Sequence, residues 1–287
     1  MSIRLGDIQF LNSWPVTYAL RQGRAGPSGI VTVSGTPADL NRRLLAGELD
    51  ASAVSSAMYL KHQDELIPIP ALCIRSDGGV KSVLVVSRQP LSALKGKTVG
   101  ISNQGATTPI LLKLLLRERG LRFIPEQTTL RYPEILRRYA AALLIGDEAL
   151  EAVQEEGMMS WDLGEAWTQW TRLPFVFALW VVRRSLAQGN PEVLEQVAGA
   201  LRDSYQWSTN HPVALVAAMR KVFPWETTFL IRYLSRLSYD LDEKAWAGLK
   251  RFAREAEEIG ELPKGTVRKM LKDSVRGERV EPRLVFA

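Results

Sequence analysis

The chain of 287 residues contains one cysteine and two histidines, and this scarcity excludes several kinds of site. Cys73 alone cannot form an intramolecular disulfide or a cysteine cluster around a metal. Its apolar neighbours predict a buried, unreactive thiol. His62 and His211 are far apart in the sequence and match no zinc-binding spacing. We therefore expect no metal site.

Sequence motifs that bind nucleotides or activate a serine nucleophile are also missing. The chain has no G-x-x-x-x-G-K-[ST], no G-x-G-x-x-G and no G-x-S-x-G. The run GKTVG at residues 96–100 lacks the upstream glycine of a phosphate-binding loop. We expect neither a nucleotide cradle nor any other cofactor.

Long apolar runs and concentrated basic patches are absent as well. No apolar span reaches 18 residues, and the N-terminus has no apolar run of signal-peptide length, so we expect a cytoplasmic protein without a membrane partner. The net charge of +6 is spread along the chain rather than gathered in a nucleic-acid-binding motif. This charge is compatible with a small acidic ligand, and it is equally compatible with a basic surface that only keeps the protein soluble.

What the sequence does contain is an alternation of strand-like and helical segments, which indicates an α/β fold with largely parallel sheets. The length favours two lobes. The pattern restarts near residue 87, and the apolar run at 173–184 can carry the chain back. We expect lobe I to comprise 1–87 and 176–287, including helices packed on it, and lobe II to comprise 88–175. Two such crossings create a hinged cleft for a small ligand.

The stretch VGISNQGATTPILLKLLL at 99–116 predicts a strand, a polar loop and an apolar helix. Thr108 is a suitable N-cap, Pro109 fits the first helical position, and Gly120 fits the end of the helix. Free backbone N–H groups and the positive end of the helix dipole then face out of the loop. The sequence therefore predicts an anion site at this helix start.

Other polar side chains follow predicted strands in the same way. In open α/β sheets ligands bind beyond the carboxyl ends of strands, so these residues are candidates for one site. Helix capping or turn formation accounts equally well for several of them. The candidates are Asn12, Ser55, Ser56, Ser82, Ser102, Asn103, Gln104, Thr107, Thr108 and Asp147. The residues alone thus predict a small-anion site and leave its chemistry open.

Several segments together resemble the chorismate dehydratases of the futalosine route to menaquinone. They occur in order as LNSWP, GTPADLNRRLLAGELDASAVSSAMYL, SVLVVSRQPLSALKGKTVGIS, LLIGDEAL and DLGEAWTQWTRLPFVFALWVVR. The resemblance covers most of residues 3–185. It implies the two-lobed fold of type II periplasmic binding proteins, and the dehydration of chorismate to 3-[(1-carboxyvinyl)oxy]benzoate.

The resemblance also implies roles for the candidate residues. Chorismate is a dicarboxylate, so we expect one carboxylate at Ser55 and Ser56 and the other at Thr107 and Thr108, with a further hydrogen bond from Ser82. Asn12 and Asp147 are the expected catalytic residues. Asn12 would hold the leaving oxygen or the enolpyruvyl group. Asp147, with a pKa raised by burial, would act as acid or base or would orient the C4 hydroxyl. The substrate's own enolpyruvyl carboxylate is the alternative base.

Two other functions remain open from the sequence. The first is 1,4-dihydroxy-6-naphthoate synthase, which belongs to the same pathway and shares the fold; we expect it to need a histidine base, which this chain lacks in its second-lobe loops. The second is a cytosolic small-anion-binding protein without catalysis. Both a monomer and a homodimer are compatible with the sequence.

Overall fold

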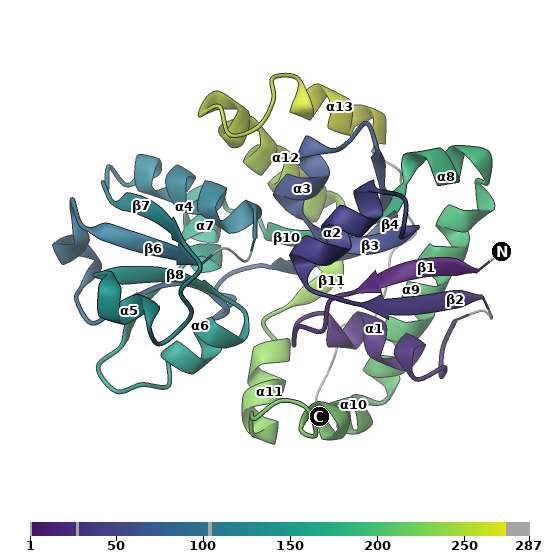
Figure 1. Cartoon of the computed structure of the whole chain (residues 1–287), viewed down its shortest axis with the longest axis horizontal. Coiled ribbons are helices and arrows are strands. Elements are labelled where there is room, and N and C mark those ends of the chain that lie inside the picture. The colour runs from purple at the N-terminus through teal and green to yellow at the C-terminus, as the bar shows by residue number, and fades with distance from the viewer. Residues whose placement is uncertain (1, 27–28, 103–104, 274–287) are drawn as a thin grey trace.

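The computed structural model describes residues 2–26, 29–102 and 105–273, and these residues form two β-sheets with helices around them (Figure 1). The strand order of the first sheet is β11 (Ser238–Asp240), β4 (Leu66–Ser76), β10 (Phe175–Arg183), β3 (Ala51–Ser55), β1 (Ile3–Asp7), β2 (Ile30–Ser34). The order of the second sheet is β7 (Ile124–Thr128), β6 (Thr98–Ser102), β8 (Ala141–Ile145), β5 (Val83–Ser87), β9 (Met159–Asp162).

Both sheets are mixed rather than largely parallel. In the first sheet β1 is parallel to β2 and β3, but β10 is antiparallel to β3 and β4. In the second sheet β6 is parallel to β7 and β8, but β5 is antiparallel to β8 and β9. β5 and β10, the first strand after each passage between the sheets, are antiparallel to their neighbours. The prediction of largely parallel sheets missed this reversal.

The chain passes between the sheets twice. It leaves the first sheet after Ser76 and enters the second at Val83, and it returns between Thr171 and Phe175. Strand β5, which the sequence analysis grouped with the first lobe, pairs within the second sheet. The first passage therefore comes before residue 83, ahead of the expected position near residue 87.

Helices cover both sheets. The helices that follow strands of the first sheet are α1 (Trp14–Arg21), α2 (Pro37–Leu45) and α3 (Ser56–Lys61). Around the second sheet, α4 (Thr107–Glu118) and α7 (Leu163–Thr171) lie on one side, and α5 (Ile135–Arg138) and α6 (Asp147–Ala152) on the other (Figure 1). The later helices are α8 (Arg184–Gly189), α9 (Glu192–Asn210), α10 (Pro212–Met219), α11 (Thr227–Leu234), α12 (Glu243–Glu258) and α13 (Thr266–Asp273).

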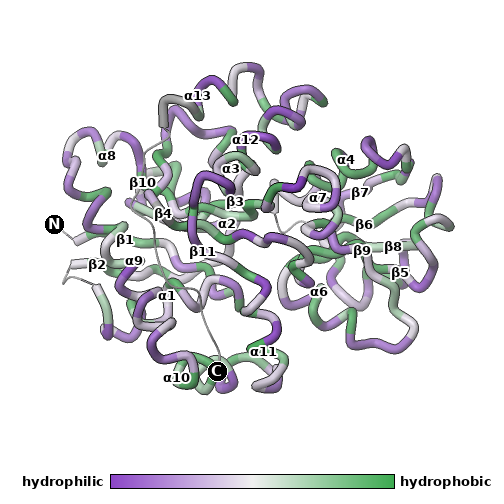
Figure 2. The backbone as a smooth tube through the Cα atoms, turned by 180° about the vertical axis from the view of Figure 1, so that it is seen from behind, coloured by the Kyte–Doolittle hydropathy of each residue, from purple (hydrophilic) through white to green (hydrophobic). Residues whose placement is uncertain are grey.

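Burial explains how the second sheet is covered. Along β5, Leu84 and Val86 pack with residues of α5 and α6, whereas Val83 and Val85 belong to the main core that contains α4 and α7. This alternation is the period of two that a strand imposes on its side chains. Figure 2 shows the resulting hydrophobic stretches along the central strands of each sheet.

Trp167, Phe175 and Trp180 are nearly inaccessible to solvent. Cys73 is buried, as predicted, and donates a weak hydrogen bond to the Asp240 carbonyl. No helix among the described residues is long and apolar enough to cross a membrane.

Candidate active site

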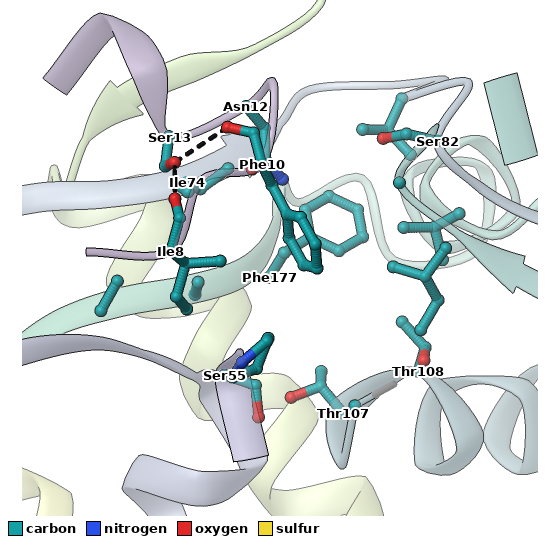
Figure 3. A pocket seen from close by; sticks show the side chains of 18 of the residues that line it. Ile8, Phe10, Asn12, Ser13, Ser55, Ile74, Ser82, Thr107, Thr108 and Phe177 are labelled. Carbon is teal, nitrogen blue, oxygen red and sulfur yellow. Dashed lines mark hydrogen bonds between the residues drawn. The ribbon is translucent and has the colours of Figure 1, made fainter. Parts of the chain in front are cut away.

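A pocket lies between the two sheets, and both sheets supply its walls (Figure 3). Most of the lining is apolar and includes Phe10 and Phe177. Its side chains with hydrogen-bonding groups are Asn12, Ser13, Ser55, Ser82, Thr107 and Thr108. The structure therefore brings five of the seven predicted site residues to one pocket: Asn12, Ser55, Ser82, Thr107 and Thr108.

The starts of α3 and α4 meet at this pocket. Ser55 precedes α3 and makes no side-chain capping bond, although capping was the alternative explanation for a serine at this position. The backbone N–H of Ala57 donates to Thr107 Oγ1 at 2.8 Å. Ala57 is in the first turn of α3, where backbone N–H groups have no acceptor within the helix. One of these N–H groups is therefore already bonded to a hydroxyl of α4.

Thr108 does not cap its helix. The helix begins two residues earlier than predicted, at Thr107 after Ala106, so Thr108 and Pro109 are its second and third residues. Proline is tolerated here because an N–H in the first turn has no intrahelical acceptor. The Thr108 hydroxyl is buried without a hydrogen-bond partner and lines the pocket. This hydroxyl is therefore available to a ligand.

Asn12 is presented by a tight turn after β1. The Ser13 hydroxyl donates to the carbonyls of Ile8 and Phe10, which folds the loop back on itself (Figure 3). The Asn12 side chain lines the pocket and has no hydrogen-bond partner among the described residues. Its amide is consequently free to bind a ligand.

Ser82 lies just before β5 and is 2% exposed. Its Oγ accepts a hydrogen bond from the Tyr233 hydroxyl at 3.0 Å. The Asn12 carbonyl accepts one from the Tyr239 hydroxyl at 2.9 Å. Sequence reasoning missed both tyrosines, because they lie in a region with no recognisable motif and meet their partners only after folding.

The structure does not bring Ser56 to the pocket. Its hydroxyl is fully buried and donates to the Val176 carbonyl at 2.5 Å, so it ties α3 to β10. The hypothesis that Ser56 binds substrate through its hydroxyl is not supported by this geometry. The sequence could not reveal that one of two adjacent serines turns into the core.

Asp147 also lies outside the pocket lining. Gly146 caps α6 with a positive φ and lines the pocket, while Asp147 is the first residue of the helix behind it. Burial, with a smaller contribution from the Glu148 charge, raises the pKa of Asp147, in the direction expected from the sequence. Its Oδ1 is buried without a hydrogen-bond partner.

The described lining residues include no side chain that titrates near neutral pH. His62 pairs with Glu65, and His211 stacks on Trp207, both away from the pocket. Ser102 donates to the Leu143 carbonyl at 3.3 Å, and Asn103 and Gln104 lie outside the described residues. No cluster of possible metal ligands occurs in the described part of the chain. The described lining residues can bind and orient a ligand, and none of them has a side chain that could act as a base.

A second, more open cavity of about 860 Å³ adjoins the pocket and shares Phe10, Pro37 and Ser55 with it. Arg131 is the charged residue that lines this outer cavity, and it is paired with Glu148. Sequence reasoning did not single it out, because one arginine among many carries no local signal. An anionic group that extends out of the pocket would meet this guanidinium.

Comparisons with known proteins agree with this arrangement. The chain is 34% identical to the chorismate dehydratase of Thermus thermophilus over 267 residues, which cover 87% of this chain and 93% of that protein. It is 28% identical to the 1,4-dihydroxy-6-naphtoate synthase of the same organism, with 90% of this chain and 95% of the relative covered.

The fold is similar to that of the periplasmic aliphatic sulphonate binding protein of Escherichia coli. The TM-score is 0.70 at 16% identity, and 93% of this chain and 96% of that chain are covered. The prediction of a periplasmic-binding-protein-like α/β fold is thereby confirmed. The sequence model that describes menaquinone biosynthesis matches residues 3–258, and this chain belongs to the menaquinone biosynthesis family.

Proposed function

We propose that this protein removes water from chorismate to give 3-[(1-carboxyvinyl)oxy]benzoate, a carbon–oxygen lyase reaction of menaquinone biosynthesis in the cytoplasm. The observation that carries the proposal is the 34% identity to the Thermus chorismate dehydratase along nearly the whole length of both chains. The pocket supports it, because an apolar cavity with hydroxyl groups suits a small cyclic acid.

The ring carboxylate binds at the start of α4 in this proposal. Thr108 supplies a buried hydroxyl without a protein partner, and the first-turn N–H groups of a 12-residue helix point the same way. The C3 proton of chorismate is vinylogous to this carboxylate. Donors that hold the carboxylate therefore also stabilise the negative charge that develops as the C3–H bond breaks.

The proton acceptor is the enolpyruvyl carboxylate of the substrate itself. No carboxylate, imidazole or amine lines the pocket among its described residues, and Asp147 lies behind Gly146. As the C3–H bond breaks, its electron pair forms the new ring double bond and hydroxide leaves C4. The departing hydroxide takes up the proton that the enolpyruvyl carboxylate removed from C3, so that one water leaves and the carboxylate is regenerated. The gain of aromaticity makes the step strongly downhill.

The protein's polar residues then have binding and orienting roles. Asn12, whose amide has no described partner, holds the enolpyruvyl group or the leaving oxygen. Ser82 donates to the substrate hydroxyl from the opposite wall (Figure 3). Arg131 meets the second carboxylate where the pocket opens outward. No cofactor takes part in this scheme.

We also propose that the two sheets are the cores of two lobes that close on the substrate. Lobe I would hold the first sheet with α1–α3 and α8–α13, and lobe II the second sheet with α4–α7. Two short passages, at 77–82 and 172–174, join them. A pocket whose walls come from both sheets is accessible when such lobes separate.

The test is to incubate the purified protein with chorismate and follow the loss of one water by mass spectrometry. Conversion in the wild type, and a loss of turnover of about 100-fold in Asn12→Ala, is expected. Asn210→Ala, which changes an exposed asparagine at the end of α9, is the matched control and should retain wild-type turnover. Absence of conversion would refute the proposal, and tight anion binding without conversion would favour a binding protein.

The 1,4-dihydroxy-6-naphthoate synthase activity is the second candidate, because the chain also matches that enzyme along most of its length. A histidine base is the expected requirement of that activity, and neither His62 nor His211 lines the pocket. The arrangement therefore favours the dehydratase.

A further inference from the structure

The segment 227–240 forms the wall behind the pocket on the side of the first sheet. It contains α11 and β11, and between them Leu237 reaches the pocket lining. Two tyrosines of this segment, Tyr233 and Tyr239, are nearly inaccessible to solvent. Each donates its hydroxyl to a residue that lines the pocket.

The Tyr233 hydroxyl donates a hydrogen bond to the Ser82 hydroxyl. The two oxygens are 3.0 Å apart, and the residues are 151 positions apart in the sequence. A serine hydroxyl has one hydrogen to donate. Because Tyr233 occupies an acceptor position on Ser82 Oγ, the Ser82 hydrogen is left for another acceptor, and none lies among the described residues. The pocket is where that hydrogen can be used.

Tyr239 is hydrogen-bonded to the backbone of Asn12. Its hydroxyl donates to the Asn12 carbonyl at 2.9 Å, although the two residues are 227 positions apart in the sequence. The turn at 8–13 is already folded by Ser13, and the Tyr239 bond fixes that turn against β11. The position of the Asn12 side chain in the pocket therefore depends on a bond from the far end of the chain.

We propose that Tyr233 and Tyr239 are positioning residues for the dehydration, Tyr233 by aligning the Ser82 hydroxyl toward the substrate and Tyr239 by holding Asn12 in the pocket. This inference rests on the proposed function. It makes the region after β10 part of the active site, although no catalytic motif occurs there.

The burial of these phenols supports a specific role for the hydroxyl groups. Phenylalanine would fill the same space without a buried polar atom, and burying a hydroxyl costs free energy that its hydrogen bond must offset. Burial, with a further contribution from the Asp147 charge, raises the pKa of Tyr233 well above its ordinary value. Tyr233 thus remains a protonated donor over the whole working pH range.

The decisive experiment for Tyr233 is a double-mutant cycle with Ser82. Tyr233→Phe should lower kcat about fivefold to tenfold, the effect of one hydrogen bond, and change KM less than about twofold. In a Ser82→Ala background the same substitution should have no effect, because its target is gone. An equal loss in both backgrounds, or no loss in either, would overturn the proposal.

Tyr239 is tested in the same way against Asn12. Tyr239→Phe should lower kcat about fivefold in the wild type and leave the residual activity of Asn12→Ala unchanged. Where turnover is too slow, the dissociation constant of the product gives the same coupling. A loss that persists in the Asn12→Ala background would show that Tyr239 has only a structural role.

Tyr139→Phe is the matched control. Tyr139 is also buried and donates its hydroxyl to Glu126 at 2.7 Å, but it lies in the second half-molecule away from the pocket. It should leave kcat unchanged. The wild type is the reference in every cycle, and its turnover of chorismate tests the proposed function separately. A failed coupling therefore refutes the positioning role alone.

Discussion

The Ala57 backbone N–H donates a hydrogen bond to the Thr107 hydroxyl at 2.8 Å, and this bond joins the helices that follow the two different sheets. Ala57 belongs to α3, which follows the first sheet, and Thr107 begins α4, which follows β6 of the second. Thr108, the next residue, keeps its hydroxyl unpaired in the pocket. Two adjacent threonines thus differ in their contacts: the Thr107 hydroxyl bonds the backbone of α3, whereas the Thr108 hydroxyl is unpaired at the pocket.

Thr107→Val should destabilise the free protein. The change keeps the side-chain shape but leaves the buried Ala57 N–H without an acceptor, at a cost of about 1–3 kcal/mol. A lower Tm in thermal unfolding, together with weaker substrate binding from the loosened pocket, is expected. Thr107→Ser keeps the hydroxyl and is the control, so a similar Tm loss in both variants would contradict this account.

Thr108→Val should have the opposite profile. Its hydroxyl has no protein partner, so removing it should leave the Tm unchanged or slightly higher. The substrate loses one hydrogen bond, which should lower kcat/KM about tenfold. Unfolding and steady-state kinetics on the same preparation separate the two effects. A clear drop in Tm with full activity would contradict the assignment of Thr108 to the ligand.

Ser55 and Ser56 form a second pair with different expected outcomes. Ser56→Ala removes the bond to the Val176 carbonyl and should lower stability by about 1–2 kcal/mol with little change in KM. Ser55→Ala removes a pocket hydroxyl that makes no capping bond, so KM should rise with the Tm unchanged. The two variants control each other, and a reversed pattern would mean that Ser56 binds the substrate after all.

The α/β class and most strand–helix units followed from the sequence, because periodicity and capping residues are local signals. Thr36 illustrates this, since a threonine before a proline is a local capping signal and Thr36 caps α2 by accepting from the Asp39 N–H. The direction of β10 was not predictable, because an apolar strand has the same residue pattern whether its neighbours are parallel or antiparallel.

The candidate site was predictable in its polar residue types and not in their orientations. Asn12, Ser82 and Thr108 line the pocket, whereas Ser56 bonds a carbonyl in the core and Asp147 follows the lining residue Gly146. The roles of Tyr233 and Tyr239 depend on contacts over 151 and 227 positions. Such contacts arise from the fold and leave no trace in local sequence patterns.

The pH dependence of turnover tests the absence of a protein base. If the substrate carboxylate accepts the proton, kcat should stay flat from about pH 6 to about pH 9, because carboxylates of ordinary pKa are ionised throughout. Steady-state kinetics in overlapping buffers provide the measurement. A rise in kcat through one ionisation near neutral pH would instead indicate a protein group, with Asp147 the first candidate because its pKa is raised.

Asp147→Asn should stabilise the protein at neutral pH and leave turnover close to the wild-type value. Burial raises the pKa of Asp147, so the folded state binds the carboxyl proton more tightly than the unfolded state does. Protonated Asp147 therefore favours the folded state below its unfolded-state pKa, and this stabilisation is lost as the pH rises through its folded-state pKa.

The side chain of the variant carries no charge at any pH. Its gain in stability over the wild type should therefore be near zero at about pH 3 and largest above about pH 7. A Tm increase of about 2–4 °C at neutral pH corresponds to about 1 kcal/mol in a chain of this size. Glu151→Gln, an exposed change on the same helix, is the control. A Tm gain that does not depend on pH, or a turnover loss of 100-fold or more (about 2.7 kcal/mol), would contradict the buried and non-catalytic placement of Asp147.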